Sequence, residues 1–165
     1  VARRFLPEDA DAADAVQDAF LSAFRGLSEF DGQAKLSTWL HRIVVNACLM
    51  KLRSRRRRPE KRIDDLLPAF KDDGHAVDPP SAWPAPEALA AGEELRAAVH
   101  AAIAQLPENY RTVLLLRDIE GVDTAQAAAM LGLEEGAVKT RLHRARQALK
   151  TLLDPVVKSH TEVEL

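Results

Sequence analysis

Polar and basic side chains share one side of the stretch EEGAVKTRLHRARQAL, which covers residues 134–149. Wound at about 100° per residue, as in an α-helix, they lie opposite an apolar stripe. The stripe consists of Val138, Leu142, Ala145, Leu149 and Leu152. The opposite side carries Gly136, Lys139, Thr140, His143, Arg144 and Gln147. Their amino, guanidinium, hydroxyl, imidazole and amide groups can donate hydrogen bonds to phosphates and to base edges.

The charge on this predicted helix is one-sided. No acidic residue occurs between Glu135 and Asp154, whereas a solvated face usually mixes both signs. Glu134 and Glu135 fall in the first turn, where acids favour the helix dipole. On this helix alone, two interpretations stay open: an ordinary basic surface helix, or a helix that lies against DNA.

The residues that must position this helix precede it in the stretch GVDTAQAAAMLGL. Asp123 suits a helix N-cap, and Gln126 follows three residues later, as in a capping box. Gly132 suits the left-handed residue after a helix end. Val138 and Leu142 could then pack against the short helix, where Ala128 allows a close crossing. The stretch predicts a helix-turn-helix, whose second helix enters the major groove of DNA.

A third predicted helix supports this pair. It lies in LPENYRTVLLLRDIEG, with Pro107 at its first position and Gly121 after its end. Its apolar residues, which would seat the other two helices, are Tyr110, Val113, Leu114 and Ile119. Residues 93–153 are therefore expected to form an all-helical module.

Composition limits the class of protein. The chain has 165 residues, of which 47% are hydrophobic and only 5% aromatic, and Ala and Leu dominate, which favours helices over sheet. The net charge of −2 does not by itself suggest a nucleic-acid partner. No apolar run approaches the length of a membrane span, no signal peptide is visible, and the single Cys48 fits a reducing cytoplasm. The opening VARRFL resembles the end of an element whose beginning is absent.

Two helical blocks flank a proline-rich stretch. Its charge changes from basic to acidic and it has no sustained period, so we expect an extended or partly disordered connector. Its large apolar residues are either anchors on a partner or local packing; they are Leu66, Leu67, Phe70 and Trp83.

The first block predicts two amphipathic helices. In EDADAADAVQDAFLSAF, one face carries Ala12, Val16, Phe20, Ala23, Phe24 and Leu27. Leu21 lies on the other face, among the polar residues Asp11, Asp14, Gln17, Asp18 and Arg25. This placement suits either a protein-contact patch or a lone exposed leucine, which is common.

The second helix, in LSTWLHRIVVNACLMKLRSRRRR, is expected to be capped by Ser37. Its predicted core stripe is Leu36, Leu40, Ile43, Ala47 and Met50. Arg42, Asn46 and Arg53 recur on another side, and Trp39 suits core packing near the helix start. The Arg55–Arg58 run is either a solvated end or a phosphate clamp.

Taken together, these blocks resemble the extracytoplasmic-function (ECF) group of bacterial RNA polymerase sigma factors. The residues that carry the resemblance are DAADAVQDAFLSAF, LSTWLHRIVVNACL and LPENYRTVLLLRDIEGVDTAQAAAMLGLEEGAVKTRLHRARQAL. The resemblance implies an all-α protein of two small helical domains joined by a flexible linker, the second being a helix-turn-helix domain. It implies a region 2-like domain at 1–57 whose N-terminal helix is missing, a linker at 58–92, a region 4-like domain at 93–154 and a tail at 155–165.

The resemblance also implies roles for individual residues. The set expected to bind core polymerase is Asp14, Gln17, Asp18 and Leu21. The loop 27–35 is expected to capture a flipped promoter base, and the set expected to bind the −10 element is Lys35, Trp39, Arg42, Asn46 and Arg53. The set expected to bind the −35 element is Gly136, Lys139, Thr140, His143, Arg144 and Gln147. The linker acids Asp64, Asp65, Asp72 and Asp73 could mimic the charge of RNA.

The partners that follow are core polymerase, promoter DNA and an anti-sigma factor, with a cytoplasmic location and no membrane insertion, cofactor or metal. One alternative is a stand-alone helix-turn-helix regulator, which leaves the acidic patch around Asp18 without a purpose. An enzyme is disfavoured, because the histidines are scattered without metal-ligand spacing to Cys48. The sequence also lacks a phosphate-binding glycine motif and a nucleophile elbow.

Overall fold

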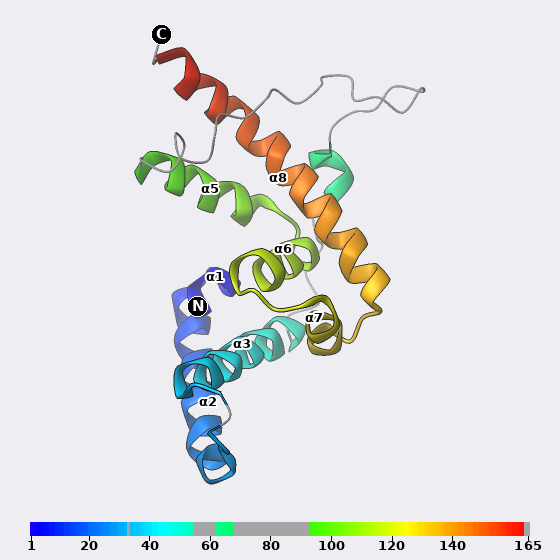
Figure 1. Cartoon of the computed structure of the whole chain (residues 1–165). Helices are drawn as coiled ribbons and strands as arrows, with labels where there is room; N and C mark the ends of the chain where they lie inside the picture. Colours follow the sequence, from blue (N-terminus) through cyan, green and yellow to red (C-terminus); the bar gives the residue numbers. More distant parts are fainter. Residues whose placement is uncertain (33, 55–61, 68–92, 164–165) are drawn as a thin grey trace. The chain divides into compact units, whose positions relative to one another are not determined.

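The computed structural model describes residues 1–32, 34–54, 62–67 and 93–163, and helices joined by turns and short loops make up this part of the chain (Figure 1). No β-strand occurs among these residues, so the all-α fold class predicted from the sequence is confirmed. Of the expected linker at 58–92, only residues 62–67 belong to the described part. The Arg55–Arg58 run, Phe70, Asp72, Asp73 and Trp83 lie outside it.

The chain divides into two compact units. The amino-terminal unit consists of Val1–Pro59 with Ala128–Leu133, and the carboxyl-terminal unit of Glu60–Ala127 with Glu134–Leu165. This division differs from the expected boundaries, because six residues around the helix-turn-helix turn group with the amino-terminal unit.

The amino-terminal unit is built on two helices, α2 (Asp9–Gly26) and α3 (Leu36–Ser54), which pack against each other. The short α1 (Ala2–Phe5) packs against both and buries Phe5 completely. A 3₁₀ turn, η1 (Leu27–Glu29), follows α2.

Alanines form the buried side of α2, at Ala12, Ala15, Ala19 and Ala23. The buried residues of α3 are Val45, Cys48, Leu49 and Leu52. Both sets recur every three or four residues, as a helix–helix contact requires. The small methyl groups let the two helices approach closely, so the contact does not need the large apolar residues of α2.

The faces of α2 and α3 therefore differ from those that the sequence pattern predicts. Phe20 and Phe24 are 65% and 82% exposed, although they share a predicted face with the buried Ala12. The predicted core stripe of α3 is wrong at both ends, because Leu36 and Met50 are exposed. Ser37 does not precede α3 as a cap: the helix begins one residue earlier, and the backbone N–H groups of Thr38 and Trp39 donate to the Lys35 carbonyl.

The carboxyl-terminal unit contains the 3₁₀ turn η2 (Ile63–Leu66) and three whole helices among its described residues. These are α5 (Glu93–Gln105), α6 (Glu108–Leu114) and α8 (Glu135–Val163), with the π-helical turn η3 (Leu115–Ile119) after α6. The short α7 (Thr124–Leu131) begins in this unit, and its residues from Ala128 on belong to the amino-terminal unit. α8 packs mainly against α6, which the sequence predicts as the support of the helix-turn-helix, and against α5. The π-helical turn leaves Ile119 45% exposed, although the helical period predicts it in the core.

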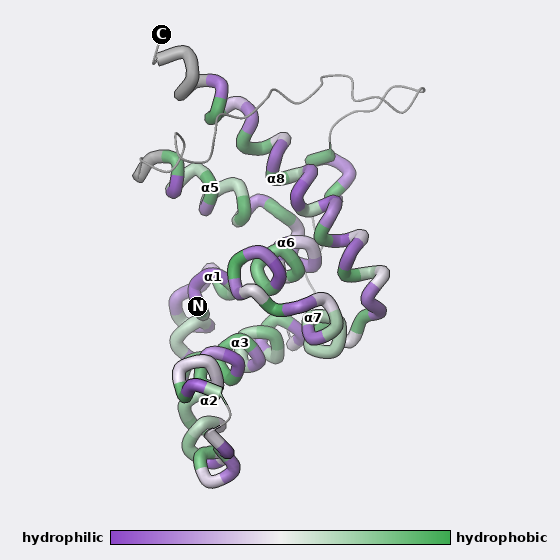
Figure 2. Tube along the Cα trace, viewed as in Figure 1, coloured by the Kyte–Doolittle hydropathy of each residue, from purple (hydrophilic) through white to green (hydrophobic). Residues whose placement is uncertain are grey.

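α8 is longer than the sequence predicts. It continues through Pro155 to Val163, beyond the expected domain end at residue 154. A proline inside a helix removes one backbone hydrogen bond. Leu153 and Val157 on either side of Pro155 are buried, so apolar packing offsets this loss. Figure 2 shows hydrophobic and hydrophilic residues alternating along the helix.

Candidate nucleic-acid and protein interfaces

The turn before α8 has the local geometry that the sequence predicts. The Asp123 carboxylate accepts a 2.8 Å hydrogen bond from the backbone N–H of Gln126, which caps α7. Gly132 ends α7 with φ of +65°, a backbone conformation that glycine adopts without strain. The backbone N–H of Leu133 then donates to the Ala128 carbonyl over 3.0 Å. These bonds fix the two ends of α7 and the turn that follows it.

The buried and exposed faces of α8 separate cleanly in its first four turns. Val138, Leu142 and Ala145 are buried. The predicted DNA-facing residues are exposed, except for the partly buried Gln147; they are Gly136, Lys139, Thr140, His143 and Arg144. The structure thus brings the whole predicted set onto one side of one helix.

Two of these side chains already have partners within the chain. The Thr140 hydroxyl donates a 3.0 Å hydrogen bond to the Gly136 carbonyl, so its lone pairs remain to accept a bond. The Arg144 guanidinium lies 4.0 Å from the Asp64 carboxylate of η2. The sequence did not signal this second pair, because 80 residues separate its members and the linker showed no periodic pattern.

A neighbouring arginine on α8 has a structural role instead. Arg146 donates to both carboxylate oxygens of Asp118 in η3, over 2.9 and 2.6 Å. The pKa of Arg146 is raised, because the hydrogen bond to Asp118 and the attraction of its charge outweigh the cost of burial. This bidentate bond ties α8 to the π-helical turn after α6.

The predicted protein-binding residues also gather on one helix. Asp14, Gln17, Asp18 and Leu21 are all exposed on α2. Asp14 has an additional contact that the sequence did not predict: it accepts a 2.8 Å hydrogen bond from Lys51 of α3. Lys51 also lies 3.7 Å from Asp11, so this lysine links α3 to two acids of α2.

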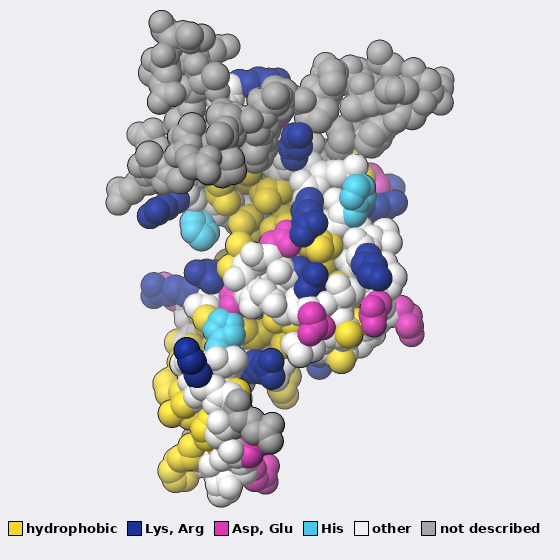
Figure 3. Space-filling model, in the orientation of Figure 1, with side chains coloured by type: hydrophobic (Ala, Val, Ile, Leu, Met, Phe, Trp, Pro, Cys, Tyr) yellow, Lys and Arg dark blue, Asp and Glu magenta, His cyan; other side chains and the backbone are white. Residues whose placement is uncertain are grey.

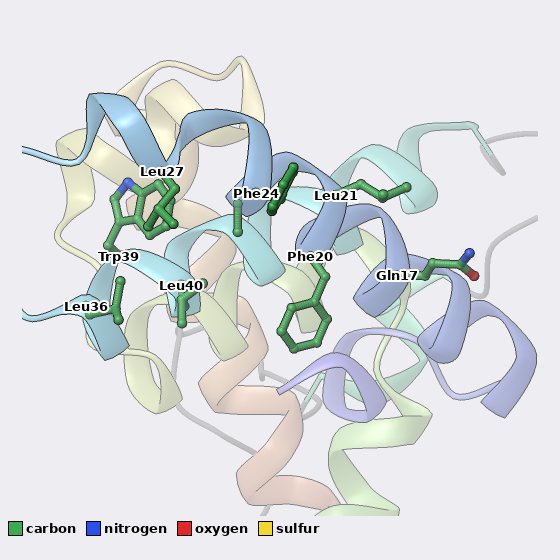
Figure 4. Close-up of a pocket in the computed structure, with 9 residues that line it drawn as sticks. Gln17, Phe20, Leu21, Phe24, Leu27, Leu36, Trp39 and Leu40 are labelled. Atoms are coloured by element: carbon green, nitrogen blue, oxygen red, sulfur yellow. The ribbon is translucent and has the colours of Figure 1, made fainter.

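An open apolar cleft of about 480 Å³ adjoins this acidic face. Gln17 and Leu21 line it together with large side chains from α2 and α3, which are Phe20, Phe24, Leu27, Leu36, Trp39 and Leu40 (Figure 4). In the close-up, Leu27 lies beside the Trp39 ring. Figure 3 shows hydrophobic side chains gathered at the surface over α2. Phe20 and Phe24 are candidate binding residues that the sequence pattern assigned to the wrong face.

The residues expected to bind the −10 element lie on and just before α3. Lys35, Arg42, Asn46 and Arg53 are exposed. Trp39 is partly buried, and its ring centroid lies 5.2 Å from that of Phe30 in the loop 27–35. Gly26 lies beside the same ring, because a Cβ at this position would be in van der Waals contact with Trp39. Trp39 thus joins the loop to the start of α3; within the loop, only Gln33 lies outside the described residues.

Three further features bear on the class of protein: membrane-spanning helices, metal-ligand clusters and the single cysteine. Among the described residues, no helix is long and apolar enough to cross a membrane. No group of three or more potential metal ligands occurs in the same part of the chain. Cys48 is buried between α2 and α3, as a small apolar residue would be.

Comparisons with known proteins match both ends of the chain. The model of the sigma-70 region 2 family matches residues 1–58, and that of the sigma-70 region 4 family matches residues 96–149. The RNA polymerase sigma-H factor of Pseudomonas aeruginosa is 35% identical over 94% of this chain and 79% of its own length. The ECF RNA polymerase sigma-E factor of Escherichia coli K12 is 35% identical over 94% of this chain and 80% of its own length.

The chain belongs to the ECF group of RNA polymerase sigma factors. ECF SigM of Mycobacterium tuberculosis H37Rv is 40% identical over 87% of this sigma factor, which spans 64% of SigM. As a member of this group, the sigma factor directs core polymerase to promoters and initiates transcription. A stand-alone regulator is disfavoured, because the similarity extends over both units.

Solved structures support the same family. The sigma factor RpoE of Bartonella quintana, in complex with the anti-sigma factor NepR, matches 92% of this sigma factor and 86% of its own chain. The TM-score is 0.58, with 26% sequence identity. CnrH, in complex with the cytosolic domain of CnrY, matches 93% of this sigma factor and 78% of its own chain, with a TM-score of 0.51 and 33% identity.

Proposed function

We propose that this sigma factor binds core polymerase and promoter DNA through three separate surfaces, on α2, α3 and α8. The exposed acidic and apolar face of α2 binds core polymerase, the exposed polar side of α3 contacts the −10 element, and the exposed side of α8 contacts the −35 element. The observation that carries the proposal is that each predicted set lies on one helix, apart from Lys35 just before α3, and that a separate buried stripe holds each helix in place.

The −35 contact is supported by charge and geometry. The exposed side of α8 offers Lys139, Thr140 and Arg144 within about one and a half turns, and no acid follows Glu135 on this part of the helix. The amino-terminal part of a recognition helix usually enters the groove most deeply. We therefore assign base-edge contacts to Lys139 and Thr140, and a phosphate contact to Arg144.

The polymerase contact is supported by the exposed apolar side chains next to the acids of α2. Phe20, Leu21 and Phe24 are each at least half exposed, and such a patch beside charged residues is typical of a protein-binding surface. Asp18 adds a charge that attracts a basic partner surface. We propose that core polymerase covers the patch formed by Asp18, Phe20, Leu21 and Phe24.

The −10 contact rests on α3 and the loop before it. Arg42 and Asn46 are one turn apart and exposed, and Arg53 follows two turns later. Trp39 is held against Phe30, which suits a residue that shapes a pocket for an unstacked base. Lys35 precedes the helix and adds a cation that can bind a phosphate.

We further propose a cytoplasmic location, no catalytic activity of its own, and control by an anti-sigma factor. The solved structure of RpoE is a complex with the anti-sigma factor NepR, and that of CnrH is a complex with the cytosolic domain of CnrY. The functional boundaries 1–57, 58–92, 93–154 and 155–165 stay part of this proposal.

The polymerase-binding face is tested by replacing Asp18 with Lys and measuring binding to core polymerase by pull-down. Asp18 has an exposed side chain, so the variant should fold and should bind core polymerase about tenfold more weakly, a loss typical of a reversed charge at an interface. Asp14→Lys is a poorer test, because it would place a second lysine beside Lys51 and disturb the contact between α2 and α3.

Glu29→Lys is the matched control, since it makes the same charge change in the same unit but on η1. It should bind core polymerase like the wild type. Equal core binding by Asp18→Lys and the wild type would refute the assignment of this face.

A further inference from the structure

The turn η2 lies against α8 in the carboxyl-terminal unit (Figure 1). Its first residue, Ile63, is only 5% exposed, which is uncommon for an apolar side chain in a short segment between stretches of irregular sequence. The packing of η2 against α8 accounts for at least part of this burial.

The same turn brings an acid to the DNA-facing side of α8. One Asp64 oxygen lies 4.0 Å from the Arg144 guanidinium, and the other accepts a 3.4 Å hydrogen bond from Arg62. Both Asp64 and Arg144 remain about half exposed, so the pair is accessible to competing ions and is weak by itself. Asp65, the next residue, is also exposed.

We infer that residues 62–67 mask the DNA-facing side of α8 when the sigma factor is free. Ile63 anchors the segment on α8, and the Asp64 carboxylate occupies the place at Arg144 that a DNA phosphate would take. The inference rests on the proposed phosphate contact of Arg144.

Competition between the two anions follows from their chemistry. Carboxylate and phosphate oxygens bind the same guanidinium donors, and two anions at one guanidinium repel each other. DNA must therefore displace the segment, and the apparent affinity for DNA equals the intrinsic affinity multiplied by the fraction of molecules in which the segment is undocked. A partner that engages residues 62–67 would release the mask without touching α8.

The test uses the full chain without polymerase, and a short fluorescently labelled random-sequence DNA duplex at low salt. Asp64→Asn removes the competing charge, and Ile63→Ala weakens the anchor without changing any charge. Each should bind the duplex about three- to tenfold more tightly than the wild type, as expected when a weakly docked segment is released. Asp65→Asn is the matched control: it removes the same charge from the neighbouring residue and should change the affinity less than about twofold.

An Arg144→Ala variant separates this inference from the proposed function. It should bind DNA more weakly than the wild type, and Asp64→Asn should have no further effect in that background, because the contact that it relieves is gone. If Arg144→Ala binds like the wild type, the proposed DNA-facing role of Arg144 fails, and the mask fails with it.

If Arg144→Ala weakens binding but Asp64→Asn and Asp65→Asn have equal effects, the mask is refuted while the DNA contact stands. A lack of tightening by Ile63→Ala, in a protein whose thermal unfolding matches the wild type, refutes the anchor. Because Asp64 is exposed, Asp64→Asn tests the inference even if Ile63→Ala proves unstable.

Discussion

At the scale of single residues, adjacent positions on α8 differ in burial and therefore in function. Val138 is fully buried, whereas Lys139, the next residue, is exposed. The helical period of about 3.6 residues turns each side chain by about 100° from the one before. One face of the helix can therefore pack in the core while another face binds a ligand. Substitutions at adjacent positions should therefore fail for different reasons.

Val138→Asp should unfold the carboxyl-terminal unit or cost it at least about 3 kcal/mol, because it places an unpaired charge in an apolar seam. Lys139→Asp, one residue away, should change the free energy of unfolding by less than about 0.5 kcal/mol, as is usual at exposed sites. Thermal and urea unfolding of both variants measure the difference. Similar unfolding curves for the two would contradict the assignment of Val138 to the core.

Contacts to base edges and to phosphates should be distinguishable on DNA. Lys139→Ala and Thr140→Ala should lose about 1–3 kcal/mol of binding free energy on the preferred −35 sequence and relax the choice of one base pair. Arg144→Ala should weaken binding on all sequences and lower the salt slope by about one, because one phosphate contact is lost. Titrations against single-base-changed duplexes at several salt concentrations provide both quantities. A sequence-specific loss for Arg144→Ala with an unchanged salt slope would reverse its assignment.

At the scale of elements, sequence patterns predicted the turn and α8 but not the contact between α2 and α3. Asp123 and Gly132 have local signatures, since a cap and a positive φ are decided by neighbouring backbone. The face that α2 buries depends instead on its partner: Ala12 and Ala19 are small enough for a close contact, so the larger Phe20 stays outside. Hydrophobic period alone cannot separate these two faces, because both lie within one broad apolar arc.

The same limit applies to contacts between distant residues. The pairs Asp14–Lys51, Asp118–Arg146 and Asp64–Arg144 join residues 28 to 80 positions apart. Each residue by itself looks like an ordinary surface charge in the sequence. The candidate DNA-facing set was predictable because it lies on one helix. The contact of residues 62–67 with that helix was not predictable from the sequence.

The bond between Asp118 and Arg146 should hold α8 against the end of α6. Asp118→Asn should lower the free energy of unfolding by about 0.5–1 kcal/mol, because the pair is bidentate but more than half of the Arg146 side chain is exposed. The pKa of Arg146 is raised in the folded state, so its contribution is present below its unfolded pKa and is lost only at far higher pH.

The effect of Asp118→Asn should therefore stay constant between about pH 6 and pH 9, where arginine remains charged. Urea unfolding across this range is the measurement, and a double-mutant cycle with Arg146→Gln isolates the pair. A coupling free energy near zero would show that the bond does not hold α8.

At the scale of the whole molecule, transcription requires two binding events, one to core polymerase and one to promoter DNA. Core polymerase binds α2 in the proposed arrangement, and promoter DNA binds α3 and α8. Substitutions on α2 and on α8 should therefore weaken the binding of different partners, because the changed residues lie on different surfaces. Either kind of substitution should reduce transcription. Asp18→Lys should bind DNA like the wild type, and Lys139→Ala/Arg144→Ala should bind core polymerase like the wild type. A loss of core binding by the second variant would show that the two surfaces are not independent.

The central claim, that this chain is a sigma factor whose α8 recognises promoter DNA, is tested most directly by run-off transcription. The wild type, Asp18→Lys and Lys139→Ala/Arg144→Ala would each be added to core polymerase with a library of promoter templates. The wild type should yield transcripts from a small set of templates that share a −35 sequence, and both variants should lose them, because polymerase is either not bound or not directed. If a folded Lys139→Ala/Arg144→Ala protein transcribes the same templates as the wild type, α8 is an ordinary basic surface helix and the claim is wrong.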